Sequence, residues 1–582
     1  MNEINLNIST RNGRTYLYIE KGYRDENGKV KKKNIQTIGY ADNYSDEYED
    51  PVAHFKEVAR KMTEDEKNER RISFSIDMEE ELPQSSAGTK NLGYVLPLKI
   101  YHELEIDKFL RSKAQTEKFE FNTNSIMILL VISRLLSPGS KKRAYDEKDR
   151  YFERFDFSLN DVYRSLLHFN KISNELQRFM HENIRRKYGS DTSVIYYDVT
   201  NYYFEINKPD ELRKYGYSKE KRKRPIVQLG LAMDKDGVPL HYEIFPGNKL
   251  DKETFRSVIG DVRKNYDTGR VIVVADMGII TGDNIYYLVG NNPAKPKNGY
   301  IFSFSVRGGT DSFQQYVLDE HGYTGADGKT VQDDSDFKIK ERVTAHDINV
   351  TMEGGSIRKK RAYEKQVVFW SKKHYLKSRS ERNELIEKAE KLIANPGKYT
   401  KATSYGAAAY VDNLEYDKDT GDILDKGVIL ALNKMKIEEE EKLDGYYSIV
   451  TSEIQMDSFS IVDTYRGLWE IEETFKITKS ELEARPVFVY DEDSIRAHFL
   501  TCFISLVIVR LIQKKIKKEY SSAEIIDCLN KIQCIHEHEN IYLLGYRSVI
   551  SDLLGDIFGF DFTKKRLWLS SIKNISASAK MC

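Results

Sequence analysis

The chain has 582 residues, too many for one ordinary hydrophobic core, so we expect several structural units. Its 91 Lys and Arg residues balance 91 Asp and Glu residues, which excludes a uniformly basic nucleic-acid binder and leaves only local segregation of charge. Four cysteines exclude a disulfide framework, and the N-terminus lacks a signal peptide's basic start and apolar core. We therefore expect a reducing, cytoplasmic compartment.

The first part of the chain is expected to hold three units. Residues 1–45 alternate short β-like stretches with turn signals at Asn12-Gly13 and Asn27-Gly28, which predicts an N-terminal β-hairpin module. Residues 46–89 are strongly charged and indicate a linker or solvated helix. Residues 90–188 have helical apolar spacing and predict an all-helical domain, our candidate for DNA binding.

Strand-like patterns dominate after this helical region. Residues 189–306 read as three strands, a helix, a strand, a helix and a strand, the order of a ribonuclease-H-like fold. Residues 307–445 predict a mainly β insertion, 446–520 the second part of the core, and 521–582 a C-terminal helical region. The predicted fold class is α/β, with a ribonuclease-H-like mixed-sheet catalytic core interrupted by a large mainly β insertion.

Two partner classes are not expected. The most apolar run, Phe499–Val509, is shorter than the roughly 20 residues of a membrane span, so it predicts a buried helix and no membrane partner. No Gly-x4-Gly-Lys-Ser/Thr loop occurs, so we expect no nucleotide cofactor.

Two carboxylates are expected where buried strands emerge. Asp198 follows the apolar run Val194–Tyr197, and Asp276 follows the run Val271–Ala275. Phosphodiester transfer requires the charge on attacking and leaving oxygens to be neutralised, and paired Mg²⁺ or Mn²⁺ ions about 3.5–4 Å apart, held by carboxylates, do this. Alone, either Asp is better explained as the turn-forming end of a strand.

A third acidic residue changes that balance. Tyr465, Glu472 and Lys479 are spaced by seven residues, which places them on one stripe of a helix. Glu472 would then complete a metal site, while Tyr465 and Lys479 would meet phosphate. The alternative is an amphipathic helix that buries Leu468 and Phe475 and exposes its charged flank.

These segments together resemble a known enzyme family. TYRGLWEIEETFKITK resembles the Tyr-x2-Arg-x3-Glu-x6-Lys signature of the insertion-sequence-four-like DDE transposases of bacterial insertion sequences. YYDVTNYYFE and VVADMGI resemble the first and second Asp motifs of that group, and the resemblance spans most of residues 190–510. It implies that Asp198, Asp276 and Glu472 are the catalytic residues and hold the metal ions.

The resemblance also implies DNA contacts. Tyr465 and Lys479 would hold the terminal phosphate or the flanking strand. Leu468 occupies the signature's Arg position, and nearby Arg466 lies about 200° around the helix from it, so Arg466 is only a candidate replacement. Arg485 resembles a family position close to the active helix.

Two further clusters remain open. Residues 213–224 are rich in Lys and Arg, which fits either phosphate contacts or a solvated loop. Cys528, Cys534, His536 and His538 match no usual structural zinc spacing.

The implied activity is cut-and-paste transposition. The enzyme would bind the terminal inverted repeats of its element, cleave strands with Mg²⁺ or Mn²⁺, and join the 3′ hydroxyl to target DNA. Its partners would be double-stranded DNA, as element ends and target, and a second copy of the chain in a homodimer on the DNA, associated with the bacterial nucleoid. Two alternatives stay open: a ribonuclease-H-like nuclease of repair or junction resolution, and a domesticated, non-catalytic DNA-binding protein.

Overall fold

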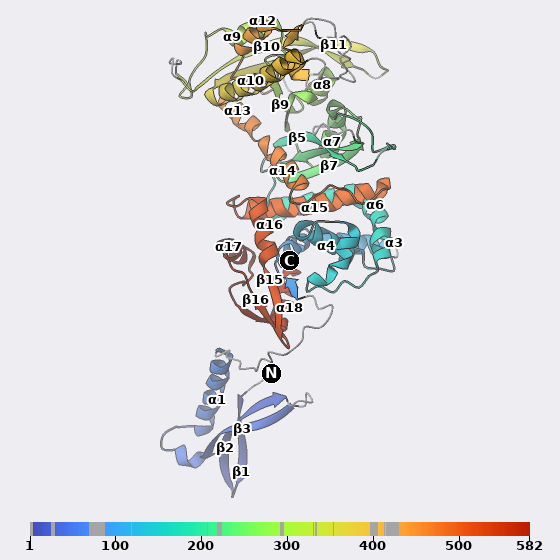
Figure 1. The fold of residues 1–582 in the computed structure, drawn as a ribbon. Coiled ribbons are helices and arrows are strands. Elements are labelled where there is room, and N and C mark those ends of the chain that lie inside the picture. The colour runs from blue at the N-terminus through green and yellow to red at the C-terminus, as the bar shows by residue number, and fades with distance from the viewer. Residues whose placement is uncertain are drawn as a thin grey trace. The chain divides into compact units, whose positions relative to one another are not determined.

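A computed structural model gives the fold (Figure 1). It describes residues 4–24, 30–68, 88–117, 119–206, 208–217, 224–291, 296–329, 331, 335–352, 354–395, 405–412, 414 and 430–581. The chain divides into two compact units, Met1–Ser86 and Ala87–Cys582.

The N-terminal unit is a three-stranded antiparallel sheet with one long helix. Its elements are β1 (Ile4–Arg11), β2 (Arg14–Arg24), β3 (Val30–Tyr40), the short helix η1 (Ala41–Tyr44) and α1 (Pro51–Asn68). Asn12 and Gly13 both have positive φ, 51° and 76°, between the paired residues Arg11 and Arg14, so the predicted hairpin turn is confirmed. The turn predicted at Asn27-Gly28 lies outside the described residues. Helix α1 packs against β1.

Helices make up most of residues 90–188. They are α2 (Val95–Glu103), α3 (Ile106–Glu117), α4 (Thr123–Leu136), α5 (Lys141–Asp146), η2 (Lys148–Arg150) and α6 (Leu159–Tyr188). A capping box between Ser158 and Asp161 begins α6 by satisfying its first backbone donors. Helices α4 and α6 pack against α15 (Glu492–Lys515).

An eight-stranded mixed sheet forms the centre of the second unit, in the order β10-β11-β14-β9-β8-β5-β6-β7. Strands β5 (Val194–Tyr203), β6 (Ile226–Met233) and β7 (Pro239–Pro246) are antiparallel, whereas β8 (Ile272–Ala275) and β9 (Gly299–Phe304) run parallel to β5. Strand β14 (Tyr446–Thr451) pairs with β9 and continues to β11 (Ile357–Ser371) and β10 (Phe337–Thr351). Two strands of the predicted insertion therefore extend the core sheet.

Helices cover both faces of this sheet. Alternate residues of β5 enter two different hydrophobic clusters, with Ile195 and Tyr197 on one side and Val194 and Tyr196 on the other. The first side packs against α7 (Asp251–Asn265) and α8 (Gly282–Val289). The second side packs against α13 (Ser458–Arg466), α14 (Trp469–Lys479) and α15.

Helix α15 passes a length and composition test for a membrane span, the one described helix to do so, but 94% of its 18-residue apolar window is buried inside the structure. It packs against α4, α6 and α14. The apolar run predicted as a buried helix is therefore a core helix of this unit.

The remaining elements surround the sheet. Between β9 and β14 lie α9 (Asp311–Leu318), α10 (Lys372–Ala394), α11 (Tyr405–Ala408), β12 (Val411–Asp412), β13 (Ala431–Leu432) and α12 (Lys434–Glu441). The C-terminal region holds α16 (Ser522–Lys531), β15 (Gln533–His538), β16 (Ile541–Leu544), α17 (Val549–Phe558), β17 (Arg566–Trp568) and α18 (Leu569–Ala579). Its strands form a sheet with β4 (Thr89–Asn91), so this region is mixed and differs from the predicted helical one. Strand β15 pairs with β4, which lies more than 400 residues earlier in the chain, and no local pattern in the sequence predicts such a pairing.

Candidate active site

The two predicted aspartates lie level with each other on neighbouring parallel strands. The register of β5 and β8 pairs Val194 with Ile272 and Tyr196 with Val274, an offset of 78 residues (272 − 194). Asp198 and Asp276 have the same offset (276 − 198), two residues beyond the last pair. Because side chains alternate along a strand, both carboxylates belong to the face that α13 and α14 cover.

Hydroxyl groups hold one oxygen of Asp276. Oδ1 accepts hydrogen bonds from the hydroxyl of Tyr465, at 3.1 Å, and from Ser303 Oγ. Ser303 Oγ also accepts from the backbone N–H of Met277, at 2.9 Å, so one residue of β9 fixes both the carboxylate and its loop. No hydrogen bond to Oδ2 is found among the described residues, and Asp276 is exposed.

A second tyrosine links this network to Glu472. The hydroxyls of Tyr447, on β14, and Tyr465 lie 2.9 Å apart. Burial raises the pKa of Tyr447, and the charges of Asp276 and Glu472 raise it further. Burial likewise raises the pKa of Tyr465, with Tyr447 and Asp276 adding to the effect. Both phenols are therefore neutral donors near two carboxylates.

The expected single helix is interrupted between Tyr465 and Glu472. Helix α13 ends at Arg466 and α14 begins at Trp469, so the prediction of one continuous stripe is wrong here. The backbone N–H of Leu468 would bond Thr464 O in a regular helix, but Tyr196 donates to that carbonyl at 3.2 Å and Leu468 bonds Tyr465 O instead. A Cβ at Gly467 would lie 1.9 Å from the Tyr196 hydroxyl, so glycine permits this approach.

Helix α14 runs alongside β5. Just before α14 begins, the carbonyl of Thr464 accepts a hydrogen bond from the Tyr196 hydroxyl. At the end of α14, the Tyr202 hydroxyl lies 2.7 Å from Thr478 Oγ1. Asp198 lies one third of the way from Tyr196 to Tyr202 along β5. A strand rises by about 3.3 Å per residue and a helix by about 1.5 Å, so this position is level with the first turn of α14. Glu472 is an exposed acidic residue of that first turn.

A buried arginine fixes α14 on α15. Arg510, only 2% exposed, donates to the carbonyl of Glu470 at 2.8 Å and to Thr474 Oγ1 at 3.0 Å. It also pairs with Glu473 at 3.3 Å. Leu468, at the signature's Arg position, is instead buried in the hydrophobic core.

Carboxylate oxygens have the chemistry that Mg²⁺ and Mn²⁺ prefer. Among the residues that the structure describes, however, no group of three or more His, Cys, Asp or Glu side chains is arranged to hold a metal ion. The same finding covers Cys528, Cys534, His536 and His538, of which the two cysteines are buried.

The predicted DNA contacts lie at two places around the carboxylates. Lys479 lies 5.7 Å from the ring centre of Tyr202, and Arg485 lies 4.9 Å from that of Tyr203, so both are four or five residues beyond Asp198 along β5, about 13–17 Å. Arg466 lies at the end of α13 and pairs with exposed Asp463 at 3.1 Å.

Basic residues also approach the tyrosine network from α10. His374 stacks on Tyr447, with ring centres 5.7 Å apart. Burial lowers the pKa of His374, and the charges of Lys377, Lys373 and Arg466 lower it further. The charges of these three cations therefore act on His374, which stacks on a tyrosine of this network. Half of the basic segment 213–224, residues 218–223, lies outside the described part of the chain.

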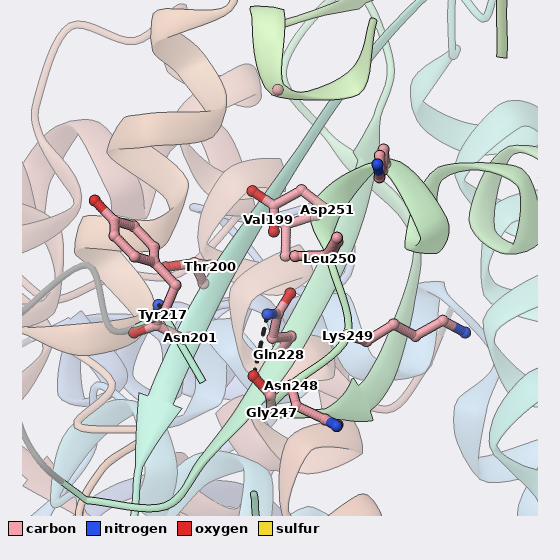
Figure 2. Close-up of a pocket in the computed structure, with 12 residues that line it drawn as sticks. Val199, Thr200, Asn201, Tyr217, Gln228, Gly247, Asn248, Lys249, Leu250 and Asp251 are labelled. Carbon is pink, nitrogen blue, oxygen red and sulfur yellow. Dashed lines mark hydrogen bonds between the residues drawn. The ribbon is translucent and has the colours of Figure 1, made fainter. Parts of the chain in front are cut away.

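A cavity of about 270 Å³ opens beside the aspartates. It begins at Val199, next to Asp198, and reaches Gly278, two residues after Asp276. Figure 2 shows the amide of Gln228 donating to the carbonyl of Gly247 on its floor. Lys249 and Lys252 are among its lining residues and bring two cations to this edge of the sheet.

Sequence reasoning missed the supporting residues. Ser303 reaches Asp276, and Tyr447 reaches Tyr465, because β9 pairs with β8 on one side and β14 on the other. His374 and Arg510 act through tertiary packing as well. None of the four lies in a local motif. The sequence predicts only that these residues belong to strand-like or helical segments.

One family model matches the N-terminal part of the chain. Residues 6–75 match the family model of the IS1634 family transposase, N-terminal domain. This match supports an insertion-sequence transposase. Among solved structures, the chain has a weak similarity to "Mos1 transposase paired-end complex with left transposon end", with 10% identity and a TM-score of 0.11. That similarity covers 38% of this chain and 60% of the Mos1 chain, so it spans less than two thirds of that protein. No curated protein matches the chain.

Proposed function

We propose that the protein is a DDE transposase that cleaves the ends of its own insertion sequence and joins them to target DNA, with Asp198, Asp276 and Glu472 as its catalytic carboxylates. The observation that carries the proposal is the equal level of Asp198 and Asp276 on neighbouring parallel strands, beneath a helix whose first turn bears Glu472. The N-terminal match to an insertion-sequence transposase domain supports the same activity.

The sheet supports a ribonuclease-H-like core. Strands β7, β6 and β5 are antiparallel neighbours, and β8 and β9 follow β5 in parallel, with α7 and α8 as the connecting helices. This order places the end of β8 beside the middle of β5, where Asp198 lies, and α14 packs against β5. We propose that the acidic groups of β5, of the residue after β8 and of α14 meet on this face.

The donor set fits hard divalent cations. Asp276 keeps Oδ1 on two hydroxyl donors, which suits an ionised carboxylate whose other oxygen faces a ligand. We propose that Asp198 and Asp276 hold Mg²⁺ or Mn²⁺ and that the exposed side chain of Glu472 turns toward them when DNA is bound. Two such ions supply neutralisation of the charge that develops on the attacking and leaving oxygens.

The chain's own residues position the reaction. Tyr465 and Ser303 orient Asp276, while Arg510 keeps α14 and thus Glu472 over β5. Lys479 and Arg485, further along β5, would hold phosphates of the DNA strand. The DNA would therefore run along β5 from the carboxylates toward these cations.

The pathway follows from the same proposal. Water would attack the phosphodiester at each element end, and the released 3′ hydroxyl would then attack a target phosphodiester with loss of another 3′ hydroxyl. We propose a homodimer on the paired ends, acting on the nucleoid in the cytoplasm, with the N-terminal unit and the helical layer as end-recognition parts.

The test is cleavage and joining on a plasmid that carries the element's ends, with Mg²⁺ or Mn²⁺. Glu472→Gln is compared with Glu438→Gln, the same change on the exposed face of α12. We expect the parent and Glu438→Gln to nick and join, whereas Glu472→Gln binds DNA but loses about a hundredfold to a thousandfold in both reactions, the range for removing one group that stabilises the transition state electrostatically.

Other results would change the proposal. Full activity of Glu472→Gln would remove Glu472 from the catalytic set. Cleavage by the parent without joining would favour a ribonuclease-H-like nuclease, and DNA binding without cleavage would favour a non-catalytic DNA-binding protein.

A further inference from the structure

Part of the long hairpin β10–β11 extends beyond the main sheet. Strand β11 pairs with β14 only over Lys365–Trp370, whereas its pairing with β10 continues to Ile357. Residues Val343–Thr351 and Ile357–Glu364 therefore form a two-stranded ribbon, called the ribbon below.

One face of the ribbon is packed and the other is open. Ile348, Val350 and Ala362 belong to the hydrophobic cluster that includes α8. On the opposite face the exposure alternates with the strand period: Ile357 is 70% exposed and Tyr363 is 49% exposed, with exposed Lys359 and Arg361 between them. No described element covers this open face.

The open face is rich in cations and hydrogen-bond donors. Lys359 and Arg361 lie on it, directly opposite Asn349 and Asp347 of β10, and Arg358 is exposed next to them. Arg361 pairs with Asp347 at 3.1 Å, but both side chains are at least half exposed, so the pair contributes no more than about 1 kcal/mol and can exchange for a phosphate.

The shape and chemistry of this face fit one class of partner. The major groove of DNA admits a two-stranded β-ribbon, and Asn, Lys and Arg are the side chains that read base edges and phosphates there. Exposed apolar Ile357 and Tyr363 are unfavourable in water and favourable against deoxyribose or a thymine methyl group.

We propose that the open face of the ribbon binds duplex DNA, with Lys359 and Arg361 on backbone phosphates and Asn349 and Tyr363 facing the groove. This inference rests on the proposed function, because β11 leads through β14 and Tyr447 to the candidate active site. The ribbon would hold the DNA duplex that enters or leaves that site.

The experiment measures binding of the full chain to a fluorescent 30-base-pair duplex by anisotropy, without divalent metal, from 50 to 200 mM KCl. Lys359→Ala/Arg361→Ala is compared with Lys388→Ala/Lys391→Ala, which removes two equally exposed cations from α10. The ribbon variant should bind at least tenfold more weakly, and the slope of log K against log salt should fall by roughly 2, because each lost phosphate contact removes about 0.9. The α10 variant should bind like the parent, and both should keep the parent's melting temperature.

The outcomes separate the two proposals. If the ribbon variant keeps the parent's affinity and slope, the ribbon does not bind DNA, whatever the parent cleaves. The ribbon inference is equally overturned if the parent binds no DNA, or if the variant only changes self-association of the chain. If the ribbon governs binding but the parent neither cleaves nor joins DNA with Mg²⁺ or Mn²⁺, the ribbon inference stands and the transposase proposal fails.

Discussion

Removing one hydroxyl group distinguishes two roles for Tyr465. The resemblance to insertion-sequence transposases implies that Tyr465 holds a DNA phosphate, whereas in the structure its hydroxyl donates to Asp276 Oδ1 at 3.1 Å. Tyr465→Phe keeps the ring, which is partly buried in the core, and deletes the hydroxyl together with its hydrogen bonds to Asp276 Oδ1 and to the Tyr447 hydroxyl. We expect the variant to fold like the parent and to bind the catalytic metal less well.

The magnitude follows from the hydrogen bonds around Asp276. A hydrogen bond to a charged group contributes about 1.5–3 kcal/mol. Because Ser303 Oγ donates to the same oxygen, the carboxylate stays oriented in part, and the lower end of that range is appropriate. About 1.4 kcal/mol corresponds to a tenfold change in an equilibrium constant. Half-saturation by Mg²⁺ or Mn²⁺ should therefore rise roughly tenfold, in line with outer-shell substitutions at other metal sites.

The assay is nicking of an element-end duplex across a metal titration, together with direct Mn²⁺ binding followed by electron paramagnetic resonance. Tyr490→Phe, at a site 73% exposed, is the matched control. DNA affinity without metal should be the same in all three chains. If Tyr465→Phe instead loses DNA affinity while its metal midpoint stays at the parent's value, the tyrosine acts on phosphate and the argument from Asp276 is refuted.

Three further predictions concern two supports of the site and one buried lysine of α5. Arg510→Met removes the buried donor of the polar groups of α14 and should lower the free energy of unfolding by about 3–5 kcal/mol, measured by urea denaturation. An unchanged denaturation midpoint would show that α14 does not depend on Arg510. Gly467→Ala should cost about 1–3 kcal/mol by overpacking, and Tyr196→Phe in the same chain should recover only part, since ring carbon Cζ also lies 2.5 Å from the added Cβ. Burial, and then the charge of Arg134, lowers the pKa of Lys141 to about 7 in the folded chain. Its pKa in the unfolded chain is about 10.4, so between these two values the unfolded chain binds more protons than the folded chain. In that pH range the free energy of unfolding of the parent therefore rises with pH. Lys141→Met should flatten that rise in melting temperatures from pH 7 to 9, and an equally steep rise in the variant would exclude Lys141 as its source.

The aspartates could be predicted because the signal for each is local. Each run of apolar, β-branched or aromatic residues predicts a buried strand, and the offset of 78 between Asp198 and Asp276 equals the strand register. Asp276 directly follows the end of β8, as predicted, whereas Asp198 lies within β5, which continues to Tyr203, so the prediction of a strand end at Asp198 is wrong. Their role is still a proposal, but their common level on neighbouring strands follows from the fold.

The supports of Asp276 could not be predicted because they come from strand pairing. Ser303 is brought to Asp276 by β9, and Tyr447 is brought to Tyr465 by β14, which is antiparallel to β9. Tyr447 follows Ser303 by 144 residues (447 − 303). The helix break at Gly467 has the same kind of cause, since it depends on the hydroxyl of Tyr196 on β5. Such contacts exist only after the sheet has formed.

The insertion shows the limit of reading domains from composition. Turn-rich stretches between residues 307 and 445 suggested a separate unit, yet β10 and β11 continue the core sheet through β14. Edge strands add to a sheet through backbone hydrogen bonds, which any sequence with suitable alternation can make. Alternation therefore predicts the strands but not the sheet that they join.

A chain with no net charge can still bind DNA next to three carboxylates if its cations are concentrated at the same edge. Lys373, Lys377 and Arg466 surround His374, which stacks on the tyrosine that contacts Tyr465, and further cations lie on the ribbon. Opposite charges within about 8–10 Å, the screening length near physiological salt, offset the repulsion between the carboxylates and phosphates. Under the proposed function, the whole-chain balance of 91 and 91 would therefore not predict the salt dependence of DNA binding. The slope of log K against log salt should instead reflect the few local cations that contact phosphate. Removing the ribbon cations Lys359 and Arg361 should therefore change this slope, whereas removing Lys388 and Lys391 from α10 should not.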